Sequence, residues 1–242
     1  MKEHMLYLTD DSVRAVLRSV NPKTQTRRVV KLPHNNPLGV WEPTLVGGPN
    51  GGRTVAGATI PEQGGIWHTR TGDSLLCPYG GPGDRLWVRE AWCRLSDVRT
   101  ADPGGDALRR HAFYRADYPG DTLMHDDNPA EKIKWRSSRF MPRWASRITL
   151  EIVSVRVERV QDVSYEDALA EGVNDFAALI GDQPNAIGET SEETARRLQW
   201  PQRQYQMVWN EINAARGHSW DANPWIWRIE FKHISNSGVA DA

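Results

Sequence analysis

Six consecutive residues near the start of the chain, Lys23 to Arg28, hold two hydroxyl groups and three cations. A threonine hydroxyl attacks as a nucleophile when a neighbouring base removes its proton, and a lysine is such a base when burial or nearby cations lower its pKa. Thr26 and Lys23, three positions apart, are therefore a candidate nucleophile and base. The same pattern of residues is also typical of a solvated edge strand.

The elements that must position this cluster can be read from the spacing of apolar residues. Residues 10–20 carry apolar side chains at helical spacing and predict a helix with Asp10 or Asp11 as its N-cap. Asn21-Pro22 ends that helix, because a proline disfavours the helical conformation of the residue before it. Residues 23–30 alternate in character and are expected to be extended.

Further elements follow along the chain. Ser164 and Asp167 resemble a capping box that opens a short helix, which ends near Glu171 with Gly172 as its stop. The remaining expected elements are strands over 85–89, 147–160 and 225–232, a loop over 181–193, and a helix that starts at Pro201 and stops at Gly217.

Two segments, at about 33–82 and 91–143, are too rich in glycine, proline or polar residues for long regular elements. We expect them to be irregular insertions, the first with a hairpin and the second with a short strand over 113–117. Strands far apart in sequence with few crossover helices favour an α+β fold around a small β-barrel. We therefore expect a single domain over 1–235, with flanking helices and a frayed tail over 236–242.

Composition excludes several function classes. The chain has 242 residues, a net charge of −1, and no apolar run of the roughly 20 residues that cross a bilayer. Two cysteines, with no apolar segment typical of a secretory signal, predict free thiols and a cytoplasmic protein. The histidines and cysteines lack the spacing of a zinc site, and the P-loop, dinucleotide and G-x-S-x-G motifs are absent. We expect no metal and no cofactor.

Four blocks in the same order carry a resemblance to a known family. Residues 21–28 are similar to the G-x-K-T-x-T-x-R signature of ASCH domains, which have a PUA-like β-barrel fold, although Asn21-Pro22 replaces the leading glycine. The blocks at 83–88, 164–172 and 225–232 resemble that family's GD-plus-strand, its short helix with a glutamate, and its closing strand. The tryptophan-rich form, with 11 tryptophans, looks like the version carried by phages and prophages.

In small bacterial members, the resemblance implies hydrolysis of the amide of N4-acetylcytidine. It assigns Lys23 as the base, Thr26 as the nucleophile and Glu171 as the acid that protonates the departing amine. Arg28 would orient the substrate or stabilise the oxyanion. We further expect Thr24, Arg85, Trp87 and Arg89 to bind the substrate, a modified cytosine nucleoside or nucleotide, in a bacterial host or a phage-infected cell.

Two other functions remain open from the sequence. Arg27, Arg28, Arg85, Arg89 and Trp87 are also the residue types of a non-catalytic module that binds RNA, DNA or a modified base. The tryptophans could instead form an interface of a phage assembly factor. Convergence of the three candidate catalytic residues in one buried site would favour the enzyme.

Overall fold

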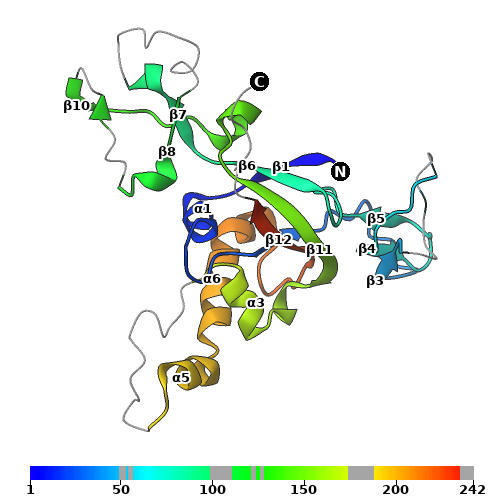
Figure 1. Ribbon diagram of the computed structural model, residues 1–242. Helices are drawn as coiled ribbons and strands as arrows, with labels where there is room; N and C mark the ends of the chain where they lie inside the picture. Colours follow the sequence, from blue (N-terminus) through cyan, green and yellow to red (C-terminus); the bar gives the residue numbers. More distant parts are fainter. Residues whose placement is uncertain are drawn as a thin grey trace. The chain divides into compact units, whose positions relative to one another are not determined.

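The computed structural model of the protein describes residues 1–48, 53, 57–98, 111–120, 124–125, 128–173 and 188–234. Helices and strands both occur along the described chain, which confirms the α+β class (Figure 1). The chain divides into two compact units. The first unit consists of Met1–Arg18, Asp84–Glu151 and His233–Ala242, and the second unit consists of Ser19–Gly83 and Ile152–Lys232. The predicted tail over 236–242 lies outside the described residues. None of the described helices is long and apolar enough to cross a membrane.

The first unit is built on the parallel strands β1 (Glu3–Tyr7) and β6 (Arg85–Arg89). The start of β11 (Thr149–Arg159) pairs with β6 in the antiparallel sense. The strand predicted over 85–89 is confirmed, and its alternation has a simple cause. Leu86 and Val88 are buried in the core, so Arg85, Trp87 and Arg89 occupy the opposite face of the sheet.

Helix α1 (Asp10–Val16) follows β1 and is shorter than the predicted 10–20. The Thr9 side chain, not that of Asp10 or Asp11, is the N-cap and accepts the Ser12 N–H at 3.3 Å. The prediction that the helix continues to residue 20 was wrong, because Val20 is 72% exposed and has no buried face to stabilise a longer helix.

The segment 91–143 is less irregular than predicted. The strand expected over 113–117 is β8 (Ala112–Tyr114), which gives way to a 3-10 turn at Arg115–Asp117. The segment also contains β7 (Trp92–Arg94), β9 (Met124–His125), β10 (Asn128–Lys132) and 3-10 turns at Leu95–Asp97 and Ser138–Phe140, and a further turn follows at Arg143–Ala145. Two small hydrophobic clusters stabilise it, built around Trp92 with Met141 and around Cys93 with Ile133.

In the second unit the strand order is β11-β12-β2, with β12 (Trp225–Ile234) antiparallel to β2 (Gln25–Val29). Arg27 lies opposite Arg228 in this register, and Thr26 lies opposite Ile229. The strands expected over 147–160 and 225–232 are therefore confirmed within two residues at each end. The described strands form four sheets, none of which closes into a barrel.

Helices of the second unit pack on a hydrophobic cluster that includes Tyr205, Trp209 and Ile226. The elements are a 3-10 turn at Val160–Asp162, α3 (Tyr165–Ala170), α5 (Ser191–Leu198), α6 (Trp200–Asn213) and a 3-10 turn at Ala214–Arg216. The capping box of α3 and the helix near Pro201 are confirmed. Helix α5 was missed because its buried residues are Ser191, Thr194 and Ala195, which make no apolar stripe. Residues 181–187 of the expected loop lie outside the described residues.

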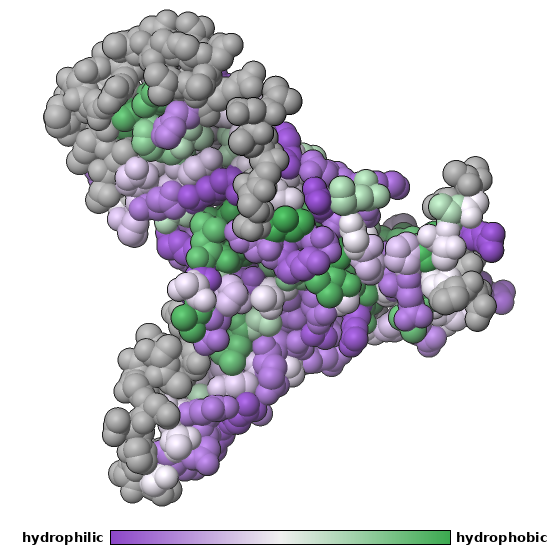
Figure 2. Space-filling view, viewed as in Figure 1, coloured by the Kyte–Doolittle hydropathy of each residue, from purple (hydrophilic) through white to green (hydrophobic). Residues whose placement is uncertain are grey.

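The segment 33–82 forms a three-stranded antiparallel sheet of β3 (Trp41–Val46), β4 (Gln63–His68) and β5 (Ser74–Leu76), more regular than the single hairpin expected. Its glycines serve close packing, since a Cβ on Gly64 would lie 2.7 Å from the Cα of Arg156. Figure 2 shows that hydrophilic residues cover much of the described surface on the side drawn, with hydrophobic residues in scattered patches.

Candidate functional site

A buried lysine and a buried glutamate, 148 residues apart in sequence, meet in the second unit. Lys23 Nζ lies 2.6 Å from Glu171 Oε2, and the two side chains are 4% and 5% exposed. Lys23 Nζ also donates to the backbone carbonyl of Glu171 at 2.5 Å. The ammonium or amine of Lys23 is thus held by two oxygens of a single residue.

The position of Glu171 follows from the helix that it ends. Ser164 accepts the Asp167 N–H at 3.0 Å and starts α3, while Gly172, with φ 86°, terminates it. The Thr24 N–H donates to the Ala170 carbonyl at 2.9 Å. Lys23 and Glu171 are the chain neighbours of these two bonded residues, so the end of the helix and the start of β2 bring them together.

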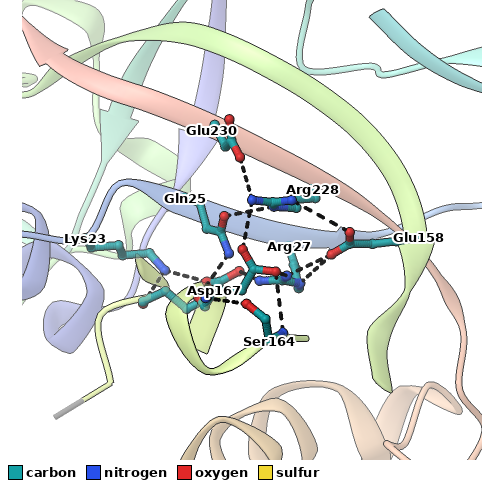
Figure 3. Close-up of polar contacts among 9 residues, drawn as sticks. Lys23, Gln25, Arg27, Glu158, Ser164, Asp167, Arg228 and Glu230 are labelled. Atoms are coloured by element: carbon teal, nitrogen blue, oxygen red, sulfur yellow. Dashed lines mark hydrogen bonds and ion pairs between the residues drawn. The ribbon is translucent and has the colours of Figure 1, made fainter. Parts of the chain in front are cut away.

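Arg27 is the centre of a wider ionic network (Figure 3). Its side chain is 0% exposed and its guanidinium contacts three carboxylates, Glu158 at 2.7 Å, Asp167 at 3.0 Å and Glu171 at 3.4 Å. The guanidinium also lies 5.7 Å from the centre of the Tyr205 ring. A buried arginine requires such partners, because an unpaired buried charge is strongly unfavourable.

Arg228 extends the network along β12. It lies 2.8 Å from Asp167 and 2.5 Å from Glu230, and its Nε donates to Gln25 Oε1 at 2.9 Å. Ser154 Oγ donates to Glu230 Oε2 at 2.6 Å. One face of the β2–β12 pair is therefore polar, and its side chains hold one another in defined positions.

Burial changes the proton affinities of this cluster. Desolvation lowers the pKa of Lys23 below that of an ordinary lysine, and this effect outweighs the attraction of Glu171. Burial also raises the pKa of Glu158, by more than Arg27 lowers it. Burial also tends to raise the pKa of Asp167, but the positive charges of Arg27 and Arg228 have the larger combined effect, so the pKa of Asp167 is lowered. Lys23 is thus the cation in the cluster that is most easily made neutral.

A groove of about 360 Å³ lies beside the network. It is lined by Thr24, Gln25, Val153, Glu166, Asp167, Ala170, Arg228, Glu230 and Phe231. Three of these side chains are carboxylates and one is a cation, so the groove offers mainly hydrogen-bond acceptors. This lining is suited to an uncharged ligand that is rich in hydrogen-bond donors, and it disfavours a phosphate.

The expected catalytic residues are brought together only in part. Lys23 and Glu171 are in contact, and Thr24 lines the groove beside them. Thr26 is buried on β2, but strand alternation places its side chain on the face opposite that of Arg27, toward Ile229. Arg28 shares the Thr26 face, where it pairs in register with Trp227.

The other expected binding residues, Arg85, Trp87 and Arg89, lie on β6 in the first unit. These three side chains share the face of β6 that is opposite its buried residues, Leu86 and Val88. Arg89 lies 5.2 Å from the centre of the Trp87 ring.

The sequence reasoning missed most of the network around Arg27. The sequence did not mark four of its members as site residues: Glu158, Asp167, Arg228 and Glu230. Arg228 and Glu230 nevertheless lie at alternate positions of a strand, on the face opposite its apolar residues. Charged residues at a regular spacing on a largely buried strand are the signal that could have found them.

Within the part of the chain that the structure describes, no group of three or more His, Cys, Asp or Glu residues is arranged to hold a metal ion. Comparison of the chain with family models, curated proteins and solved structures found no match.

Proposed function

We propose that the protein is an amide hydrolase that removes an acyl group from N4 of a cytosine nucleoside. The observation that carries the proposal is the buried contact of 2.6 Å between Lys23 Nζ and Glu171 Oε2. The four blocks that resemble ASCH domains support the same activity, and with it we propose the PUA-like fold of that family.

The contact fits both an ammonium that donates to a carboxylate and a carboxyl that donates to an amine. Because burial lowers the pKa of Lys23, transfer of the shared proton from the Lys23 ammonium to the Glu171 carboxylate, which gives the neutral form of the pair, is easier than it is for an exposed lysine. In that form Lys23 is a base and Glu171 is an acid. Both roles of general acid–base catalysis are then present in one pair.

The proposed reaction balances with water as the second reactant. The Lys23 amine takes a proton from a water molecule as the water oxygen attacks the acyl carbonyl carbon. The Glu171 carboxyl then protonates N4 as the C–N bond breaks, which releases the cytosine nucleoside and a carboxylic acid. Proton transfer from the Lys23 ammonium to the Glu171 carboxylate restores the pair.

We assign the attack to water rather than to Thr26, because Thr26 lies on the opposite face of β2 from Arg27, whose guanidinium contacts Glu171. Substituting Thr26→Val removes the hydroxyl at nearly constant volume. Activity that survives this change supports attack by water, and activity that disappears in a folded variant assigns the attack to Thr26.

The groove supports a nucleoside as the substrate. Its carboxylates at Asp167 and Glu230 accept hydrogen bonds from sugar hydroxyls or a base N–H, and they repel a phosphate. Val153, which is 52% exposed and lines the groove, provides an apolar wall for the base.

The proposal is tested by incubating the purified protein with N4-acetylcytidine and measuring the release of cytidine and acetate by chromatography. We expect a rate of release that is highest where the pair holds a single proton and that falls at both lower and higher pH, and a loss of at least about a hundredfold in Glu171→Gln. No release above the spontaneous rate, or full activity in Glu171→Gln, would contradict the proposal.

A further inference from the structure

Aromatic and cationic side chains alternate on the outer face of the parallel strands β1 and β6. We call this the cation–aromatic face, and it consists of Met5, Tyr7, Arg85, Trp87, Arg89 and Arg143. Met5 pairs in register with Trp87, and Tyr7 pairs with Arg89. The other face of the same strands is core, where Leu6 and Leu86 are 0% exposed.

The cations on this face are stacked against the rings. Arg89 lies 5.3 Å from the centre of the Tyr7 ring and 5.2 Å from that of Trp87. Arg143 lies 5.8 Å from the Trp87 ring. Each of these distances is within the range of cation–π interactions. The result is a continuous series of rings and guanidinium groups across two strands.

Hydrogen bonds fix this arrangement in place. Arg89 Nε donates to the Met141 carbonyl at 2.9 Å, and its Nη1 donates to the Tyr7 hydroxyl at 2.9 Å. Arg143 lies 3.1 Å from Glu3. A surface whose side chains are already ordered loses little conformational entropy when a ligand binds.

The face is accessible and carries a surplus of positive charge. Met5 is 47% exposed and Tyr7 is 39% exposed, and Phe140, which lies close to Arg143 in sequence, is 72% exposed. Arg85, Arg89 and Arg143 outnumber the two acidic residues beside them, Glu3, which contacts Arg143, and Glu151, which lies opposite Arg85 in the sheet register.

We propose that the cation–aromatic face binds single-stranded nucleic acid. Bases stack on exposed rings, and arginines bind the phosphates that link those bases. An apolar protein partner would take the charges of Arg89 and Arg143 out of water, which is unfavourable, whereas phosphates pair with them. A duplex fits less well because its bases are stacked on one another and cannot reach the rings.

The test uses the full-length protein and fluorescently labelled oligonucleotides of 12 deoxythymidines or 12 uridines, with a labelled duplex of the same length. Fluorescence anisotropy measures the Kd between 50 and 300 mM salt. We expect both single strands to bind more tightly than the duplex, and binding to weaken as salt rises. Trp87→Ala should weaken binding about tenfold, because stacking is lost. Arg85→Gln should lower the slope of log Kd against log salt by about one.

Two further variants separate a lost contact from a lost fold. Trp87→Phe keeps an aromatic ring and is expected to retain binding within about threefold. Trp67→Ala removes a tryptophan that is 37% exposed from β4 in the other unit and should leave the Kd unchanged. Absence of binding at 50 mM salt, equal binding of the duplex, or equal weakening by Trp67→Ala and Trp87→Ala would overturn the proposal. So would a poly-glutamate peptide that displaces the oligonucleotide at equal concentration.

Discussion

Replacing Glu171 by glutamine is the sharpest perturbation of the buried pair. The glutamine has nearly the same shape, but it removes the negative charge that faces Lys23 at 2.6 Å. The backbone carbonyl of residue 171 still accepts from Lys23, and Arg27 keeps its contacts to Glu158 and Asp167. The change therefore isolates one charge in an otherwise intact network.

Removing one partner of a buried ion pair costs about 3–5 kcal/mol, because the other charge is left without compensation. We expect the lower end, about 3 kcal/mol, since glutamine can still accept a hydrogen bond and Lys23 can lose its proton. For a chain of this size, that corresponds to a decrease in Tm of about 6–12 °C. Glu166→Gln, on the same helix, is the matched control. Its carboxylate is 67% exposed and pairs with Arg196 at 2.9 Å, so we expect a cost of at most about 1 kcal/mol.

The pH dependence of this variant has a definite sign. Without Glu171, the pKa of Lys23 in the folded protein falls further, because the charge that raised it is gone. The unfolded chain, with an ordinary lysine pKa of about 10.4, then binds more protons than the folded protein at alkaline pH. The free energy of unfolding of Glu171→Gln should therefore rise as pH increases toward about 10.4, and be lost as pH falls through the folded pKa.

Urea unfolding followed by circular dichroism at several pH values measures these quantities. The double variant Lys23→Met with Glu171→Gln should be destabilised by less than the sum of the two single changes, because no uncompensated charge remains. A cost for Glu171→Gln equal to that of Glu166→Gln, or a stability that does not rise with alkaline pH, would refute the reasoning.

Three other outcomes follow from individual contacts. Ser164→Ala removes the N-cap of α3 and should lower the free energy of unfolding by about 1 kcal/mol in urea unfolding, with an unchanged value contradicting the capping geometry. Gly64→Ala should lower the Tm by more than Gly65→Ala, because a Cβ on Gly64 would meet the Arg156 backbone at 2.7 Å while the nearest atom to a Cβ on Gly65 is 3.1 Å away; equal Tm values would contradict this packing. Burial raises the pKa of Cys77 and of Cys93 to about 12, so neither thiol should react with Ellman's reagent at pH 8 until urea unfolds the chain, and rapid reaction of the native protein would count against their burial.

Local signals in the sequence predicted local structure well. The Ser164–Asp167 capping box depends on residues three apart, and the alternation over 85–89 depends on one strand, so both could be read directly. Strand parity also indicates which residues share a face. It placed Thr26 and Arg28 together, and the structure puts Arg27 on the other side with its three carboxylates.

These local signals do not identify residues or strands that pair across a large separation in sequence. The periodicity of β6 does not indicate that β1 pairs with it in parallel, because β1 has a single buried residue, Leu6, to mark it as a strand. Likewise, nothing local connects Arg27 to Glu158, which lies 131 positions away. The Lys23–Glu171 contact was expected through the family resemblance, and no pattern of spacing over 148 residues specifies it.

The rate of cytidine release by Lys23→Met, compared with that of Lys31→Met, tests the central claim most directly. Lys31 is an exposed lysine a few residues further along the chain, so its replacement changes the net charge equally without touching the buried pair. We predict that Lys23→Met loses at least about a hundredfold in rate on N4-acetylcytidine, while Lys31→Met keeps the wild-type rate. Equal rates for the two variants would contradict the assignment of Lys23 as the catalytic base.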